Sequence, residues 1–239
     1  VGDVILSHSL LLSFPEVDKK RTALTGISWG GVLTSVATSL DHRFRAAVPV
    51  YGCGFLAESG RMKQQLDKLS LLERETWIKQ YDPSVYLSRA KCPVLFLNGT
   101  NDVHFYLPSM TQSAALVSKG QVLIKYKLRH GHGHGWNNQE IGTFIDHYLC
   151  NGPALPKIKS LRLQDNILSV KAVSSSPVQK VVLYYTTDTI VEQEKCEWHF
   201  VEAVPSGKEW KVELPQKVVR WFVNVTDNSG NQLSGDLQE

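Results

Sequence analysis

The pentapeptide Gly26-Ile27-Ser28-Trp29-Gly30 decides the fold. Residues 21–27 form a short β-prone stretch before the serine, and residues 31–40 carry small and apolar side chains at helical spacing after it. A strand, a G-x-S-x-G turn and a helix together make a nucleophile elbow, whose strained turn raises the serine hydroxyl above the sheet. Flanking glycines are expected there because side chains would collide with the crossing helix. We therefore predict that Ser28 is a nucleophile, in preference to an idle serine in a glycine-rich turn.

A carboxylate and a histidine follow in the order that this elbow requires. Residues 91–98 are a nearly continuous apolar run, which is typical of a buried parallel strand, and the run ends in Gly99-Thr-Asn-Asp102. Residues 113–117 then read as a helix and residues 121–127 as a strand, before a histidine-rich loop. Because the carboxyl ends of parallel strands share one edge of the sheet, we expect Asp102 beside Ser28. The order Ser, Asp, His is that of the α/β-hydrolase triad.

The histidine-rich loop offers three candidates for the general base, namely His130, His132 and His134. We expect His132, which lies a few residues past the predicted strand end and has glycines on both sides; His130 is the first alternative and His134 the second. The alternating H-G-H-G-H pattern could also hold zinc. No Glu or Cys lies close by in the sequence, so we predict no metal site and no cofactor.

Four segments resemble one known family. The stretch Leu24-Thr-Gly-Ile-Ser-Trp-Gly-Gly31, the run from Ala46 to Phe55, the Asn98–Asp102 turn and the His130–Trp136 loop are similar to the acetyl-xylan-esterase and dienelactone-hydrolase-like branch of α/β-hydrolases. That branch neighbours the prolyl-oligopeptidase-like group. The resemblance covers residues 1 to about 152. It implies that Ser28 is the nucleophile, Asp102 the orienting acid, His132 the base and the Trp29 amide an oxyanion donor, and it favours an exported protein.

The chain departs from that family at its beginning. A complete α/β-hydrolase has several strands before the elbow strand, and the second oxyanion donor follows one of them. Here only a predicted helix over residues 1–12 precedes the elbow strand. We therefore expect the sequence to be the C-terminal portion of a longer protein. Loss of one oxyanion donor costs on the order of 10²–10³ in rate, so the chain alone is expected to be impaired.

Composition limits the possible functions. The 239 residues are 42% hydrophobic and hold 26 Lys+Arg against 23 Asp+Glu. This near balance gives no reason to expect nucleic acid or an anionic membrane as a partner. No apolar run is long enough to span a bilayer. The four cysteines show no metal-binding spacing. Oligomeric state cannot be read from these features.

The segment between the strands at residues 46–51 and 93–98 is longer than a simple crossover. It contains a predicted helix over residues 66–77 and a turn at Asp82-Pro83-Ser84. Such an insertion either caps the active site or is an ordinary crossover with a loop. Trp29 and Phe55 are candidate walls of the substrate pocket, with aromatic core packing as the alternative.

The pattern changes after Asn151-Gly-Pro-Ala-Leu-Pro156 from helix-and-strand alternation to a period of two. Short strands are predicted at residues 167–173, 180–185, 198–201, 209–214 and 220–225. They resemble an immunoglobulin or fibronectin type III sandwich. We therefore predict an α/β fold in two domains: the C-terminal part of an α/β-hydrolase parallel sheet with flanking helices (residues 1–152) and a small all-β sandwich (residues 153–239). Trp198, Trp210 and Trp221 suggest either sugar stacking or, preferably, core and interdomain packing.

These features predict a serine carboxylic-ester hydrolase that forms an acyl-enzyme. The resemblance implies a small-molecule or carbohydrate ester, such as acetylated carbohydrate, as the substrate. An S9-like serine peptidase is the alternative enzyme. The alternative from another class is a non-catalytic carbohydrate-binding protein built on a degenerate hydrolase.

Overall fold

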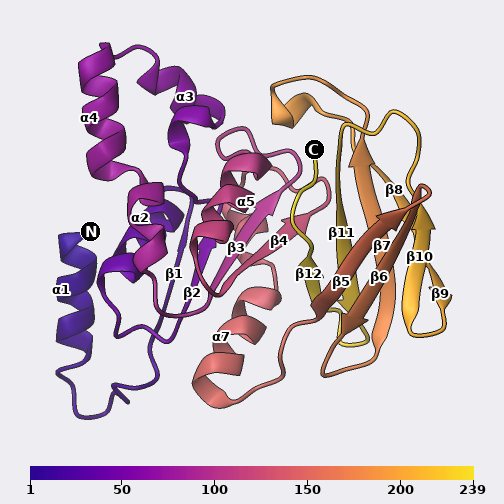
Figure 1. Cartoon of the computed structure of the whole chain (residues 1–239). Helices are drawn as coiled ribbons and strands as arrows, with labels where there is room; N and C mark the ends of the chain where they lie inside the picture. Colours follow the sequence, from indigo (N-terminus) through magenta and orange to yellow (C-terminus); the bar gives the residue numbers. More distant parts are fainter.

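The computed structural model describes all 239 residues as two sheets with helices gathered around one of them (Figure 1). Four parallel strands form the hydrolase-like half: β1 (Ala23–Ile27), β2 (Ala46–Val50), β3 (Val94–Gly99) and β4 (Gly120–Lys125). The helices of this half are α1 (Gly2–Leu11), α2 (Trp29–Leu40), α3 (Gly60–Leu66), α4 (Leu71–Tyr81), α5 (Leu107–Leu116), α6 (His132–Trp136) and α7 (Glu140–Cys150). None of them is long and apolar enough to cross a membrane.

The rest of the chain is all β. Its strands are β5 (Lys157–Gln164), β6 (Ile167–Val173), β7 (Val178–Thr186), β8 (His199–Glu202), β9 (Val204–Ser206), β10 (Glu209–Glu213), β11 (Arg220–Asp227) and β12 (Gln232–Ser234). Val181, Leu183, Val223 and Val225 of β7 and β11 form a buried cluster with Leu168, Val170 and Val212 of β6 and β10. Two sheets therefore face each other across an apolar core, and the predicted α/β sheet followed by a β-sandwich is confirmed.

One sheet runs through both halves. Its strand order is β1-β2-β3-β4-β12-β11-β7-β8, while β5-β6-β10-β9 form the second sheet of the sandwich. The junction depends on side chains: Ser234 Oγ accepts a hydrogen bond from Ile124 N at 2.7 Å, and Asn224 Nδ2 donates to Ile124 O at 2.9 Å. The division at residue 152 falls in the segment between α7 and β5. We retain it as a proposal, because the hydrogen-bonded sheet continues across it.

Two details of the fold differ from the sequence expectations, and a third decides between the two alternatives for Trp198. The single helix predicted over residues 66–77 is two helices, α3 and α4, because Ser70 and Glu73 form a capping box that starts a new helix. The loop after residue 131 contains the short helix α6. Trp198 is 2% exposed and packs on Phe222 in the core shared with the hydrolase-like half, as the packing interpretation predicted.

Close backbone contact fixes the elbow against β2, and of the expected pair of flanking glycines only Gly26 takes part in it. A Cβ on Gly26 would lie 2.4 Å from Gly30 O, and one on Gly52 would lie 2.3 Å from the carbonyl carbon of Gly31. A Cβ on Gly30 would have nothing within 4 Å. The crossing therefore needs Gly26, Gly31 and Gly52, whereas Gly30 faces open space.

Gly52→Ala is expected to destabilise the protein by about 1–3 kcal/mol, because the colliding atoms are backbone atoms that cannot rotate away. Gly30→Ala, in the first turn of α2, should leave stability unchanged or raise it by up to about 1 kcal/mol, since alanine favours helix. Chemical denaturation of both variants measures the difference. Equal stability of the two variants would contradict a close crossing at Gly52.

Candidate active site

The turn between β1 and α2 holds Ser28 in a strained conformation. Ser28 has φ 58° and ψ −121°, a region that residues with a side chain rarely adopt. Its amide donates to Val50 O at 2.8 Å, and its carbonyl accepts from the amides of Gly31 and Val32. The turn is thus held from both sides, and the strain is compensated by these bonds. The Ser28 side chain is partly exposed at the carboxyl end of the parallel strands.

Ser28 lies at one end of a hydrogen-bonded chain that continues through His130 to Asp102. His130 Nε2 is 3.0 Å from Ser28 Oγ, and His130 Nδ1 is 3.0 Å from Asp102 Oδ2. The Asp102 side chain is fully buried, whereas that of His130 is 12% exposed. The geometry is that of a nucleophile, a base and an orienting carboxylate.

The expectation that His132 occupies the place between Ser28 and Asp102 is wrong. β4 ends at Lys125, two residues before the predicted end at residue 127, and Lys127 then adopts a left-handed φ of 55°. This early turn brings His130 to the position that counting had given to His132. His132 begins α6, is exposed, and has its ring centroid 6.1 Å from that of His130. His134 is also exposed, and the three histidines do not form a group that could hold a metal ion.

The glycine that lets this loop approach is Gly135, not the neighbours of His132. A Cβ on Gly135 would lie 2.5 Å from Ile27 Cδ1 and 2.6 Å from Tyr51 Cε2. A Cβ on Gly133 would have nothing within 4 Å. The short helix α6 thus packs directly on the ends of the elbow strand and of β2.

The Asp102 carboxylate is held by backbone amides on the side away from the histidine. Asp102 Oδ1 accepts from His104 N at 2.6 Å and from Phe105 N at 3.0 Å. Its other oxygen is free to accept from His130 Nδ1. Two donors on Oδ1 fix the rotation of the carboxylate, and His130 thereby receives a defined partner.

Aromatic and imidazole rings surround His130. The Tyr51 ring centroid lies 4.8 Å away, and the Tyr51 hydroxyl donates to Arg129 O. Burial, and then the charge of Asp102, raises the pKa of Tyr51, so that it stays protonated as a donor. The His104 ring is edge-on to His130 at 4.5 Å. Burial, and then the positive charge of a protonated His130, lowers the pKa of His104, which keeps that ring neutral.

The two predicted pocket walls lie in different surroundings. Trp29 follows Ser28 as the first residue of α2 and is 48% exposed. As the first helical residue, it has an amide with no acceptor inside the helix. Phe55 is partly buried with φ 56°, and its amide donates to Asp82 Oδ1 at 2.9 Å. Trp29 therefore borders the nucleophile directly, whereas the Phe55 backbone belongs to the insertion after β2.

A second aspartate–histidine–hydroxyl chain serves a different purpose. His8 of α1 is 2.7 Å from Asp41 Oδ2 through Nδ1 and 2.9 Å from Thr22 Oγ1 through Nε2. All three residues are buried, and the Arg43 guanidinium also contacts Asp41. Thr22 precedes β1, so it lies at the other end of that strand from Ser28. We interpret this chain as the anchor of α1; it shows that the bonding pattern alone does not identify a nucleophile.

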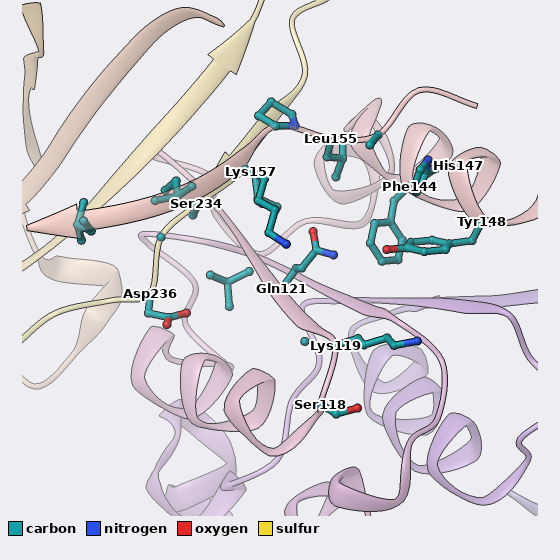
Figure 2. Close-up of a pocket in the computed structure, with 18 of the residues that line it drawn as sticks. Ser118, Lys119, Gln121, Phe144, His147, Tyr148, Leu155, Lys157, Ser234 and Asp236 are labelled. Atoms are coloured by element: carbon teal, nitrogen blue, oxygen red, sulfur yellow. The ribbon is translucent and has the colours of Figure 1, made fainter. Parts of the chain in front are cut away.

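One cavity, shown in Figure 2, also lies apart from Ser28, which is not among its lining residues. It measures about 850 Å³ and lies at the junction of the two halves, against the beginning of β4, the end of α7 and the beginning of β5. Lys119, Gln121, Tyr148, Lys157 and Asp236 are among its lining residues. Its histidine, His147, bonds Gly152 O through Nδ1, and Ser234 Oγ is engaged at the sheet junction. The cavity therefore lacks a paired nucleophile and base.

Comparison with known proteins found one matching family and several similar structures. The sequence profile of the prolyl oligopeptidase family matches residues 1–146. Among solved structures, the acetyl xylan esterase from Paenibacillus sp. R4 is 25% identical with a TM-score of 0.50, over 62% of this chain and 51% of that one. The acylaminoacyl peptidase of Pyrococcus horikoshii is 22% identical with a TM-score of 0.52, over 62% and 27% of the two chains.

A third structure, of 2,6-dihydroxy-pseudo-oxynicotine hydrolase, is 17% identical with a TM-score of 0.52, over 62% of this chain and 46% of that one. The chain thus spans about half or less of the solved chains that it resembles. No curated protein sequence matches it.

Proposed function

Because the chain belongs to the prolyl oligopeptidase family of serine hydrolases, we propose that it hydrolyses carboxylic esters through Ser28, His130 and Asp102. The observation that carries the proposal is the bonded chain from Ser28 Oγ through the His130 ring to Asp102 Oδ2, with both distances at 3.0 Å. The likeness to the acetyl xylan esterase supports short-chain esters, acetylated carbohydrate among them, as the substrate class.

Each residue has a definite part in the proposed reaction. Ser28 Oγ attacks the ester carbonyl while His130 Nε2 takes its proton, and the Asp102 carboxylate stabilises the imidazolium. His130 then gives that proton to the departing alkoxide, which leaves an acyl group on Ser28. A water molecule, deprotonated by His130, releases the acid and restores Ser28. The Trp29 amide, at the N-terminus of α2, is the proposed donor to the oxyanion.

The second candidate is a serine peptidase that uses the same three residues. The family profile favours it, since that family is named for peptidases. The chemistry differs only in the leaving group, because His130 would protonate an amine instead of an alkoxide. Ester hydrolysis is the easier of the two reactions for this site, because an alkoxide leaves more readily than an amine.

Labelling with a fluorophosphonate, followed by peptide mapping, tests whether Ser28 is activated. We expect one adduct per chain, on Ser28, and none in Ser28→Ala. Ser35→Ala is the matched control, because Ser35 lies on the same helix and its hydroxyl makes no hydrogen bond. A folded wild-type chain that takes no adduct would overturn the proposal.

Substrate preference is then decided by matched acetyl esters and aminoacyl anilides. Ester turnover that exceeds amide turnover and disappears in Ser28→Ala would support the esterase. Amide turnover of equal or greater efficiency would support the peptidase. Retention of acetylated polysaccharide without turnover would favour a binding protein.

A further inference from the structure

We propose that Gln193, from the all-β part of the chain, is a positioning residue for Asp102; this inference rests on the proposed function. Gln193 lies in the segment of residues 187–198 that connects β7 to β8, and it begins a short 3₁₀ helix, Gln193–Lys195. Figure 1 shows this segment as the orange loop with a short helical turn above β11. The Gln193 side chain is buried, with 1% of the residue exposed.

The buried amide of Gln193 satisfies three backbone groups of the acid loop, which we define as residues 99–107. Its Nε2 donates to Gly99 O at 3.2 Å and to Asp102 O at 3.4 Å. Its Oε1 accepts from Leu107 N at 2.6 Å. The side chain therefore bridges the beginning, the middle and the end of the loop. One of its contacts is the carbonyl of the residue whose carboxylate orients His130.

Further hydrogen bonds join the acid loop to the connecting segment. Asn101 Nδ2 donates to Cys196 O at 3.0 Å, and the Tyr106 hydroxyl donates to Glu194 Oε2 at 3.3 Å. Burial, and then the charge of Glu194, raises the pKa of Tyr106 to about 12, so the hydroxyl remains a donor.

The connecting segment is itself anchored to the sandwich. Arg220 of β11 donates through Nη2 to Ile190 O at 3.2 Å and lies 3.1 Å from Cys196 Sγ. Trp198 is buried against Phe222. Gln193 thus holds the acid loop in a fixed position relative to the sandwich. The sandwich is therefore part of the catalytic unit and not a detachable accessory.

Loss of the Gln193 amide should disturb the alignment of Asp102 with His130. The variant Gln193→Met keeps a similar volume but leaves Asp102 O and Leu107 N without partners, and it leaves Gly99 O only the 3.4 Å bond from Asp102 N. Small displacements of catalytic groups cost about 10- to 100-fold in rate. We expect kcat for an acetyl ester to fall by that factor while KM stays within about twofold.

The hydrogen bond between His130 Nδ1 and Asp102 Oδ2 supplies a readout that a general loss of stability would not move. A ring proton held between an imidazole and a carboxylate gives a downfield proton NMR signal, and the position of that signal depends on the length of the bond. Displacement of Asp102 in Gln193→Met should therefore shift this signal upfield or abolish it, together with the fall in kcat at an unchanged KM.

The experiment compares the full-length wild type with Gln193→Met, Gln179→Met and Leu168→Ala. Gln179 is an exposed glutamine on β7, and Leu168 lies in the sandwich core away from the acid loop. Leu168→Ala is expected to lower the melting temperature without changing kcat or the proton signal of the bond between His130 and Asp102. Unchanged kcat and an unchanged signal in Gln193→Met, or an equal change in Leu168→Ala, would overturn the proposal.

The same NMR signal separates this proposal from the proposed function. It is assigned to His130 by its absence in His130→Gln, and it can be recorded in a chain that turns over no substrate. A shifted or missing signal in Gln193→Met alone supports the positioning role even if no hydrolysis is found. An identical signal in wild type and Gln193→Met refutes the role even if the wild type is active.

Discussion

His130→Gln should lower ester turnover by about 10⁴-fold, because it removes the only side chain that bridges Ser28 and Asp102. Glutamine can hydrogen-bond but cannot take the proton from Ser28 Oγ at neutral pH. Labelling of Ser28 by a fluorophosphonate should slow to a similar degree. The measurement is kcat/KM for an acetyl ester together with the rate of labelling.

His132→Gln is the matched control, two residues further along the same loop. His132 is exposed and makes no hydrogen bond to Ser28 or Asp102, so turnover should remain within about threefold of the wild type. If His132→Gln instead abolishes activity while His130→Gln retains it, then His130 is not the base. Comparable losses in both variants would point to disruption of the whole loop.

Asp102→Asn should lower turnover by about 10³- to 10⁴-fold with little loss of structure. Asp102 Oδ1 accepts from two backbone amides, His104 N and Phe105 N, and only an oxygen can fill that place. The asparagine must therefore turn its NH₂ group toward His130 Nδ1. That nitrogen then has to accept, which leaves the ring proton on Nε2, facing Ser28. A protonated Nε2 cannot take the proton of the nucleophile.

Asp227→Asn provides a control with the same chemistry away from the site. Asp227 is also buried, and its Oδ1 accepts from Ser229 N and Asn231 N while Oδ2 accepts from Ser174 Oγ. We expect a change in thermal stability without a change in kcat. Wild-type kcat in Asp102→Asn would show that the carboxylate does not set the tautomer of the base.

Local features of the sequence were sufficient to predict the elbow and the acid. The small-residue pattern around Ser28 requires a tight crossing of strand and helix, and the apolar run before Asp102 requires a buried strand that ends there. Parallel strands then place both side chains at one edge. Period-two patterning likewise predicted β6, β7, β8, β10 and β11.

The choice of candidate base depended on the residue at which β4 ends. His130, His132 and His134 alternate with glycines, so the local sequence does not show which of them reaches Ser28 and Asp102. Only the end of β4 at Lys125 and the left-handed turn at Lys127 decide this. The ends of strands are set by neighbouring strands and by loop contacts, such as the bond from Lys127 N to Thr100 Oγ1. Residues near 127 carry no local signal for such a contact, so counting selected His132.

The sequence by itself determined the class of fold, the candidate nucleophile and the candidate acid, because each depends on residues adjacent in the chain. The tertiary structure alone decided three things: His130 as the histidine between Ser28 and Asp102, the continuous sheet from β1 to β8, and Gln193 beneath the acid loop. Each depends on groups far apart in sequence that meet only in the folded chain: His130 with Ser28 and Asp102, β12 with β4, and Gln193 with Asp102. A polar side chain such as Gln193 is typical of a surface loop until the fold buries it, and its partners are backbone groups that leave no mark in the sequence.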